Sequence, residues 1–132
     1  MFTIDKMSRT PIYEQLIERF EACILSGDIS SDGQLPSVRT LSQELNINPN
    51  TLQRAYMEIE RRGLCYTVPG SGRYISKDAL ERLRDSAAEK TGALERLLEE
   101  LRIKGVTEET VLAIVAKAYG HGENNEGKVK TE

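Results

Sequence analysis

The segment from Asn48 to Arg62 constrains the fold of this chain more than any other, because its sequence marks both ends of a helix. Asn48 is a favourable N-cap residue, and Pro49 stands at the first helical position, where its missing N–H costs nothing. Gly63 directly follows the last periodic residue and is a typical helix stop. We therefore predict a helix that begins at Pro49 and ends before Gly63.

This helix is predicted to have two different faces. Its apolar residues recur at three and four positions and form one stripe that faces a core; they are Leu52, Ala55, Tyr56 and Ile59. The rest of its first turn and a half carries hydrogen-bonding side chains, namely Asn50, Thr51, Gln53 and Arg54. Side chains of this kind contact base edges and phosphates when the start of a helix lies in the DNA major groove. The solvated face of an ordinary amphipathic helix explains the pattern equally well.

The neighbouring segments favour the DNA-binding interpretation. A shorter helix is predicted after Ser37, with Leu41 and Leu45 inward, and only residues 46–48 separate it from the next helix, as in a helix-turn-helix unit. Downstream, residues 64–68 and 73–76 are predicted strands around a turn at residues 69–72. Together these elements predict a winged helix-turn-helix, and the fold class is mainly α with a small β wing (α+β).

The motifs of this region resemble those of the GntR family of bacterial transcription regulators. The family pattern appears, over about residues 8–76, as Gly33, the Leu35–Arg39 box, the helix after Asn48, Gly63-Leu64 and the wing Gly70-Ser71-Gly72. The variant at residues 48–51 and the short helical C-terminal part are similar to the YtrA-type subgroup. The resemblance implies a transcriptional repressor that binds double-stranded operator DNA with an inverted repeat as a homodimer, and that controls neighbouring transport genes.

The resemblance also implies which residues contact DNA. Arg39 is expected to hold a phosphate or base, the start of the helix to approach bases, and Pro69 and Gly70 to form the wing tip in or beside the minor groove. Many members carry arginine where this chain has Pro49 and Gln53, so base preference cannot be transferred. The expected set is Arg39, Asn48, Pro49, Asn50, Thr51, Gln53, Arg54, Pro69, Gly70 and Arg73, with Arg73 expected on a phosphate.

Before the helix-turn-helix, residues 2–4 are expected to form a short strand or an extended arm over the core. Thr10 is expected to cap a helix that begins at Pro11 and ends at Gly27, and residues 30–34 to form an exposed connection. The two cysteines, Cys23 and Cys65, are not in a Cys-x-x-Cys pair. We expect buried thiols, with a redox switch as the alternative.

The C-terminal part, residues 77–119, is predicted to be a helical hairpin, with a long charged helix to about Ile103 and a second helix capped by Thr107. Such a hairpin is too thin to bury both of its apolar stripes, so we expect two chains to pair through them; packing on the chain's own winged helix is the alternative. The expected dimer residues are Leu80, Leu83, Ala87, Leu94, Leu97, Leu98, Leu101, Val111, Leu112, Ile114, Val115, Ala118 and Tyr119. This organisation gives domains 1–76 and 77–119 and a disordered tail at 120–132.

The charge of the chain is an argument against DNA binding. Its net charge is −3, and the first 76 residues hold eight basic against nine acidic side chains, whereas a DNA-binding domain is usually basic. We therefore expect the basic residues Arg9, Arg39, Arg54 and Arg73 to gather on one face. The acidic balance also supports an alternative, a winged helix that serves protein contacts as an assembly scaffold.

Other classes of function find little support. No stretch approaches the ~20 apolar residues of a membrane span, and early charges at Asp5, Lys6 and Arg9 argue against a signal peptide, so we expect a cytoplasmic protein without membrane partners. His121 is the only histidine, and no catalytic set or metal cluster accompanies it. We expect no enzyme activity, cofactor or metal. The sequence shows no effector pocket.

Overall fold

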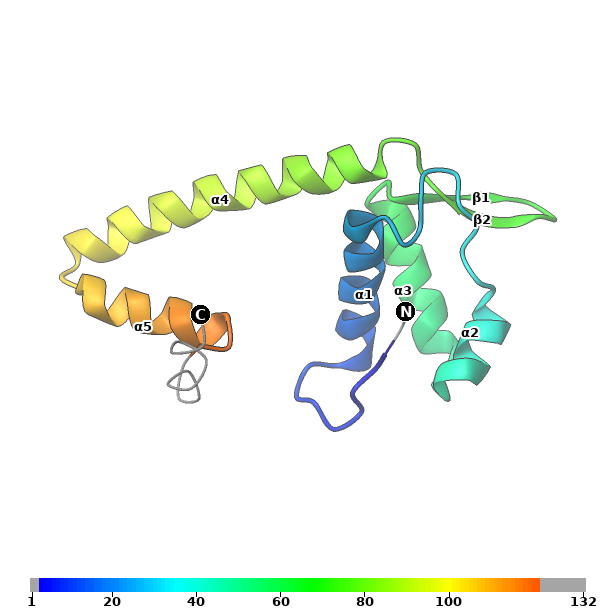
Figure 1. Ribbon diagram of the computed structural model, residues 1–132, viewed down its shortest axis with the longest axis horizontal. Helices are drawn as coiled ribbons and strands as arrows, with labels where there is room; N and C mark the ends of the chain where they lie inside the picture. Colours follow the sequence, from blue (N-terminus) through cyan, green and yellow to red (C-terminus); the bar gives the residue numbers. More distant parts are fainter. Residues whose placement is uncertain (1–2, 122–132) are drawn as a thin grey trace. The chain divides into compact units, whose positions relative to one another are not determined.

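A computed structural model describes residues 3–121, which belong to two compact units, Met1–Ala87 and Ala88–Glu132. The first unit contains α1 (Ile12–Ser26), α2 (Val38–Leu45), α3 (Pro49–Arg61), β1 (Cys65–Val68) and β2 (Gly72–Ile75) (Figure 1). The helix α4 (Ala79–Ile103) begins in the first unit and continues into the second, which also contains α5 (Glu108–Ala118). The predicted order of helices and strands is confirmed.

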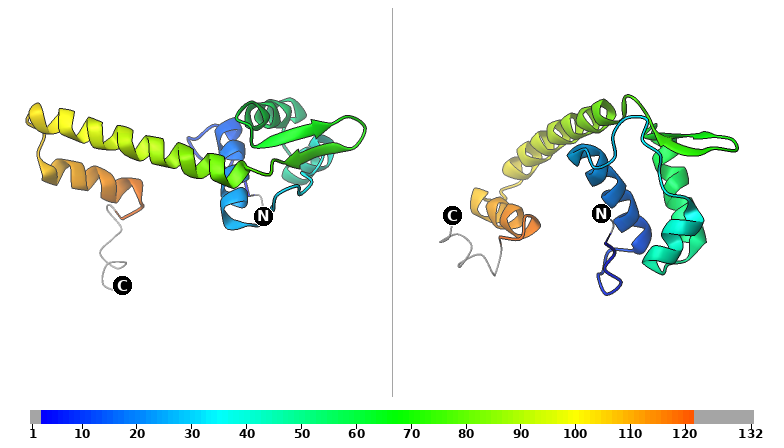
Figure 2. Two further views of the ribbon diagram at one scale, coloured as in Figure 1. Left: turned by 90° about the horizontal axis from the view of Figure 1, so that it is seen from above. Right: turned by 45° about the vertical axis from the view of Figure 1, so that its right-hand side comes forward.

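The core of the first unit lies where α1 and α3 pack side by side, as the views in Figures 1 and 2 show. The rings of Phe20 and Tyr56 are in contact there, with centroids 5.0 Å apart. All four members of the predicted stripe on α3 are buried. This burial fixes the rotation of α3 about its axis, and thereby which side chains it presents outward.

The ends of the helices follow the local sequence signals, with one exception. Asn48 caps α3 by accepting the backbone N–H of Asn50 at 2.8 Å, and Ser37 caps α2. The prediction that Thr10 caps α1 is wrong, because α1 begins at Ile12 without a side-chain cap. The carbonyl of Thr10 instead accepts a hydrogen bond from the amide of Gln15 at 2.8 Å.

The wing is a β-hairpin in which β1 and β2 pair antiparallel, with Cys65 opposite Ile75 and Val68 opposite Gly72. The segment before α2 pairs with the free edge of β2. Gln34 forms an isolated bridge with Tyr74, and the N–H of Leu35 donates to the carbonyl of Arg73 at 2.8 Å. The end of the connection predicted at residues 30–34 is therefore paired with the wing.

The first turns of α4 belong to the core of the first unit. Ala79 is buried, and Leu80 and Leu83 pack partly buried against the same core. The sequence assigned Leu80 and Leu83 to a dimer seam, but the structure gives both an apolar partner in their own chain. Their hydrophobic character therefore needs no second subunit.

The second unit has no buried side chain within residues 88–121. Thr107 caps α5 by accepting the N–H of Thr110 at 3.2 Å, as predicted, and Gly120 follows the helix end with a φ of 77°. The predicted tail lies outside the described residues from position 122 onward. Among the described helices, none combines the length and apolar character needed to cross a bilayer.

Candidate nucleic-acid interface

One flank of α3 faces the wing and the loop that leads into α2. Helical spacing places four residues on this flank: Pro49, Gln53, Tyr56 and Glu60. The hydroxyl of Tyr56 donates to the carbonyl of Pro36 at 2.5 Å. The carboxylate of Glu60 accepts from the Thr67 hydroxyl at 2.9 Å and lies 3.5 Å from Arg73 Nε. Gln53 is therefore presented on the same side as the wing.

The opposite flank of α3 faces α1. Helical spacing places Thr51, Arg54, Glu58 and Arg62 there. The guanidinium carbon of Arg54 lies 4.7 Å from the ring centroid of Tyr13, and Arg62 forms an ion pair with Glu21 at 2.9 Å. Arg54 is exposed, so its contact with Tyr13 holds a cation at the surface between α1 and α3.

The outward face of α3, between these flanks, is polar at its start. Asn48, Pro49 and Asn50 are exposed, whereas Thr51 and Gln53 are partly buried. The side-chain oxygen of Asn48 is occupied by the cap, so Asn50 and Gln53 are the better placed for contacts with a partner. Met57 lies one turn after Gln53, with 58% of its surface exposed.

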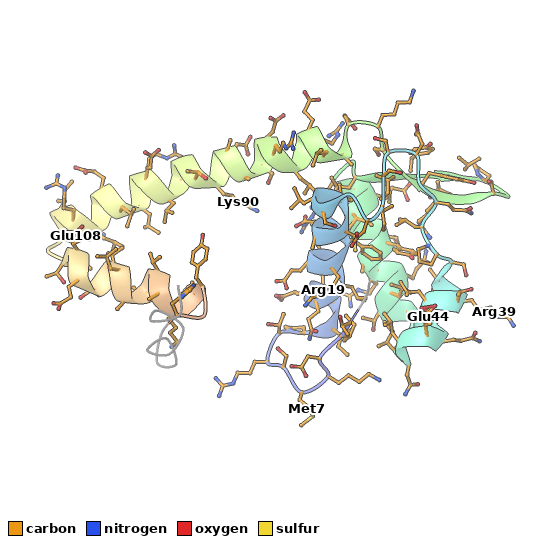
Figure 3. All side chains as sticks on the ribbon, in the orientation of Figure 1. Met7, Arg19, Arg39, Glu44, Lys90 and Glu108 are labelled. Atoms are coloured by element: carbon orange, nitrogen blue, oxygen red, sulfur yellow. The ribbon has the colours of Figure 1, made fainter. Side chains whose placement is uncertain are left out.

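Arg39 and the wing tip belong to the elements next to α3. Arg39 belongs to the first turn of α2, is exposed, and points away from the rest of the unit in Figure 3. An open cleft separates the loop before α2 from the wing turn, and Ser37, Pro69 and Gly70 contribute to its lining. The cleft thus places the start of α2 beside the wing tip, and the shared contact of Arg39, the start of α3 and the wing tip with DNA stays a prediction.

Arg73 lies differently from the other predicted DNA-contacting residues. Its guanidinium carbon is 5.1 Å from the ring centroid of Tyr56, and only 20% of its side chain is exposed. Burial raises the pKa of Tyr56 well above its usual range, against the opposing effect of Arg73, and keeps the phenol neutral. The geometry gives Arg73 a packing role under the wing, and its phosphate contact stays a prediction.

Sequence reasoning missed the part that Gln34 has in the wing. Its side-chain amide donates to the carbonyl of Ser71 at 3.0 Å. A Cβ at Gly72, where φ is 136°, would stand 2.7 Å from Gln34 Nε2. The glycine pair of the wing was the available signal, because a second glycine in a hairpin turn often marks the close approach of another group.

The helices and wing described above are those of a known family. A profile described as "Bacterial regulatory proteins, gntR family" matches residues 12–75. The chain is also 34% identical to the structure of a GntR family transcriptional regulator from Listeria monocytogenes, over 86% of this chain and 98% of that one, with a TM-score of 0.62. The chain belongs to the GntR family. The predicted family and fold class are thereby confirmed.

Two further GntR comparisons concern function. The chain is 46% identical over 79 residues to the HTH-type transcriptional repressor YtrA of Bacillus subtilis (strain 168). That match covers 60% of this chain and 61% of YtrA. It is 27% identical to the DNA-binding domain of AraR in complex with operator ORX1, over 58% of this chain and 93% of that one, with a TM-score of 0.50.

Proposed function

We propose that this GntR family regulator is a homodimeric transcriptional repressor that binds an inverted-repeat operator through the start of α3. The observation that carries the proposal is the polar start of a capped, rigid helix, where Asn50 is exposed and Gln53 is partly exposed. YtrA, a repressor by name, and AraR, seen on its operator, support it.

Each part of this surface has a distinct role in the proposal. The amides of Asn50 and Gln53 read base edges, since a planar amide can donate and accept at once. Arg39 contacts the phosphate backbone and sets the register, while Pro69 and Gly70 bring the wing backbone close to the DNA. Asn48 and Pro49 act indirectly, because Asn48 caps α3 and Pro49 fixes the backbone of its first residue. Thr51 and Arg54 lie on the flank that faces α1.

The homodimer is supported by the apolar surface of the second unit. Leu112 and Tyr119, for example, are 57% and 77% exposed. The apolar residues of this surface are Leu94, Leu97, Leu98, Leu101, Val111, Leu112, Ile114, Val115, Ala118 and Tyr119, and Ala87 directly precedes the unit. A second copy of the chain would remove this surface from water. Two-fold symmetry would also present two copies of α3 to half-sites about one helical turn (~34 Å) apart.

A protein-docking role for the winged helix is the second candidate, and the exposure of Met57 on α3 favours it. Docking surfaces, however, usually carry several aromatic or apolar anchors. The outward face of α3 combines Met57 with Asn50 and Arg61, which are polar or charged. This composition suits a nucleic acid better than an apolar protein groove.

The proposal is tested by a mobility-shift titration with duplex DNA from the chain's own promoter region. We expect Asn50→Ala and Gln53→Ala each to weaken binding by about tenfold or more, because one amide–base pair is worth about 1–3 kcal/mol of discrimination. Arg19→Ala, at an exposed position on α1, is the matched control and is expected to bind like the unchanged protein. Equal binding by all four proteins would contradict the proposed role of α3.

A further inference from the structure

Residues 5–10, here named the arm, form a fixed structure at the start of α1. Gln15, which is only 9% exposed, holds them through three hydrogen bonds. Its side-chain oxygen accepts the N–H of Asp5 at 2.9 Å, and its amide donates to the carbonyls of Asp5 at 2.9 Å and Thr10 at 2.8 Å. A buried side chain that makes three bonds to one short segment fixes the position of that segment.

The arm lies next to the turn that introduces the recognition helix. The ammonium group of Lys6 donates to the carbonyl of Asn46 at 2.6 Å. Asn46 ends α2 with a φ of 55° and stands two residues before Asn48, the cap of α3. Figure 3 shows Met7, in the arm, and Arg39, on α2, on opposite sides of this turn.

The width of the DNA major groove determines what lies beside a helix that enters it. The major groove is about 12 Å wide, and a helix with its side chains is about 10–12 Å across. A recognition helix that enters the groove therefore has a phosphate backbone on each flank. One flank of α3 faces the wing, where Glu60 accepts from Thr67, and Figure 3 shows Arg39 on the side of α3 away from α1. The other flank, toward α1, carries Arg54 over the ring of Tyr13.

We propose that the arm supplies a second set of phosphate contacts, through Lys6 and Arg9, on the DNA strand opposite the one that Arg39 contacts. This inference rests on the proposed function. An ammonium group has three donors, so the bond from Lys6 to Asn46 leaves two for phosphate oxygens. Arg9 is exposed in the same segment. Gln15 is a positioning residue, because it orders the arm before DNA arrives and so reduces the ordering cost of binding.

The salt dependence of operator binding tests the proposal. One lost phosphate contact lowers the slope of log affinity against log salt by about 0.9. We expect Lys6→Gln and Arg9→Gln each to flatten the slope by about that amount, and the double variant by about twice as much. Arg19→Gln removes an equal charge from the middle of α1 and is expected to leave the slope unchanged. An unchanged slope in the double variant would overturn the proposal.

Ethylation interference on the same operator locates the contacts. We expect the unchanged protein to show blocked phosphates on both strands, and the Lys6→Gln, Arg9→Gln double variant to lose those on one strand only. Arg39→Gln is expected to lose those on the other strand. If the double variant keeps the full pattern, the arm proposal is wrong while the proposed function stands. If the unchanged protein binds no duplex, the proposed function is wrong and the arm proposal falls with it.

The role of Gln15 is tested by non-additivity. Gln15→Leu removes all three hydrogen bonds to the arm, and we expect it to flatten the slope as the double variant does. Adding Lys6→Gln and Arg9→Gln to Gln15→Leu is then expected to change the slope little further. A slope that falls by the full amount again would show that the arm contacts DNA without Gln15. Circular dichroism confirms folding, and the two arm variants carry the test if Gln15→Leu does not fold.

Discussion

The guanidinium carbon of Arg73 lies 5.1 Å from the ring centroid of Tyr56, beneath the wing. Its Nε is 3.5 Å from a carboxylate oxygen of Glu60, in the last turn of α3. Arg73 therefore links β2 to α3. Its contacts with Tyr56 and Glu60 replace part of the hydration of the guanidinium group. The contact ties the wing to α3.

Arg73→Ala is therefore expected to affect stability more than DNA affinity. Loss of the cation–π contact and of the packed side-chain stem should lower the free energy of unfolding by about 1–2 kcal/mol, as measured by urea titration. Arg39→Ala, on the exposed start of α2, is expected to do the reverse: native stability and a flatter salt dependence of DNA binding. If the Arg73→Ala protein instead has native stability and a flattened slope, the result would support the phosphate contact that the sequence suggested.

Gly72 and Gly70 are expected to differ in their tolerance of a side chain. A Cβ at Gly72 would meet Gln34 Nε2 at 2.7 Å with φ at 136°, whereas at Gly70, with φ at 80°, nothing lies within 4 Å. Gly70→Ala should cost about 1–2 kcal/mol of backbone strain alone, and Gly72→Ala more. Thermal unfolding of both variants measures the difference. Adding Gln34→Ala to Gly72→Ala should recover part of the loss, and equal melting points for the two glycine variants would contradict this contact.

Glu58 is expected to contribute to stability in a defined range of pH. Hydrogen bonds from Arg61 and Arg62 lower its pKa from 4.5 to about 2. Because the pKa is lower in the folded state, the stabilisation is complete above about pH 4.5 and is lost as the pH falls toward about 2. Glu58→Gln should therefore be less stable than the unchanged protein at pH 7 and approach it near pH 2. Urea titrations across this range measure the effect; a constant difference at every pH would argue against it.

The two thiols are expected to react slowly in the folded protein. Cys23 and Cys65 are buried, and burial raises the pKa of both, that of Cys65 to about 11. Little thiolate is then present at neutral pH. We expect slow reaction with Ellman's reagent in buffer and rapid reaction of two thiols in guanidinium chloride. Rapid reaction of either thiol in the native protein would favour the redox alternative.

Leu97 is expected to lie in the dimer interface. A charge placed on the apolar surface of the second unit would have to be buried on association, so Leu97→Glu should yield a monomer with weaker operator binding. Leu25→Glu is the matched control, because Leu25 is about equally exposed but lies on α1 of the first unit. Light scattering after gel filtration measures the mass. A dimeric Leu97→Glu protein, or a monomeric unchanged protein, would contradict the proposed pairing.

Local sequence signals predicted the elements of the fold well. The cap at Asn48, the proline at position 49 and the spacing of Leu52 to Ile59 each act within a few residues, and the structure shows all three as predicted. The turn of the wing was predicted for the same reason. These features depend on residues that are neighbours in the chain, so a single sequence is enough to predict them.

Features that depend on distant contacts were predicted less well. Gln15 fixes a segment that ends five residues before it. The carbonyl of Thr10 accepts a hydrogen bond from the Gln15 side chain, and Thr10 does not cap a helix. The packing of Arg73 was not predicted, because its neighbours in the sequence do not reveal that Tyr56 and Glu60 lie beside it in space. Only the packing of α3 against the wing brings these groups together.

Selection of bound duplexes from a random DNA pool tests most directly whether the start of α3 reads a specific sequence. For the unchanged protein we predict enrichment of one inverted repeat whose half-sites are about one helical turn (~34 Å) apart. For Gln53→Ala we predict the same spacing with relaxed preference at one position of each half-site. Recovery of unrelated sequences, or no bound DNA at low ionic strength, would contradict the proposed function.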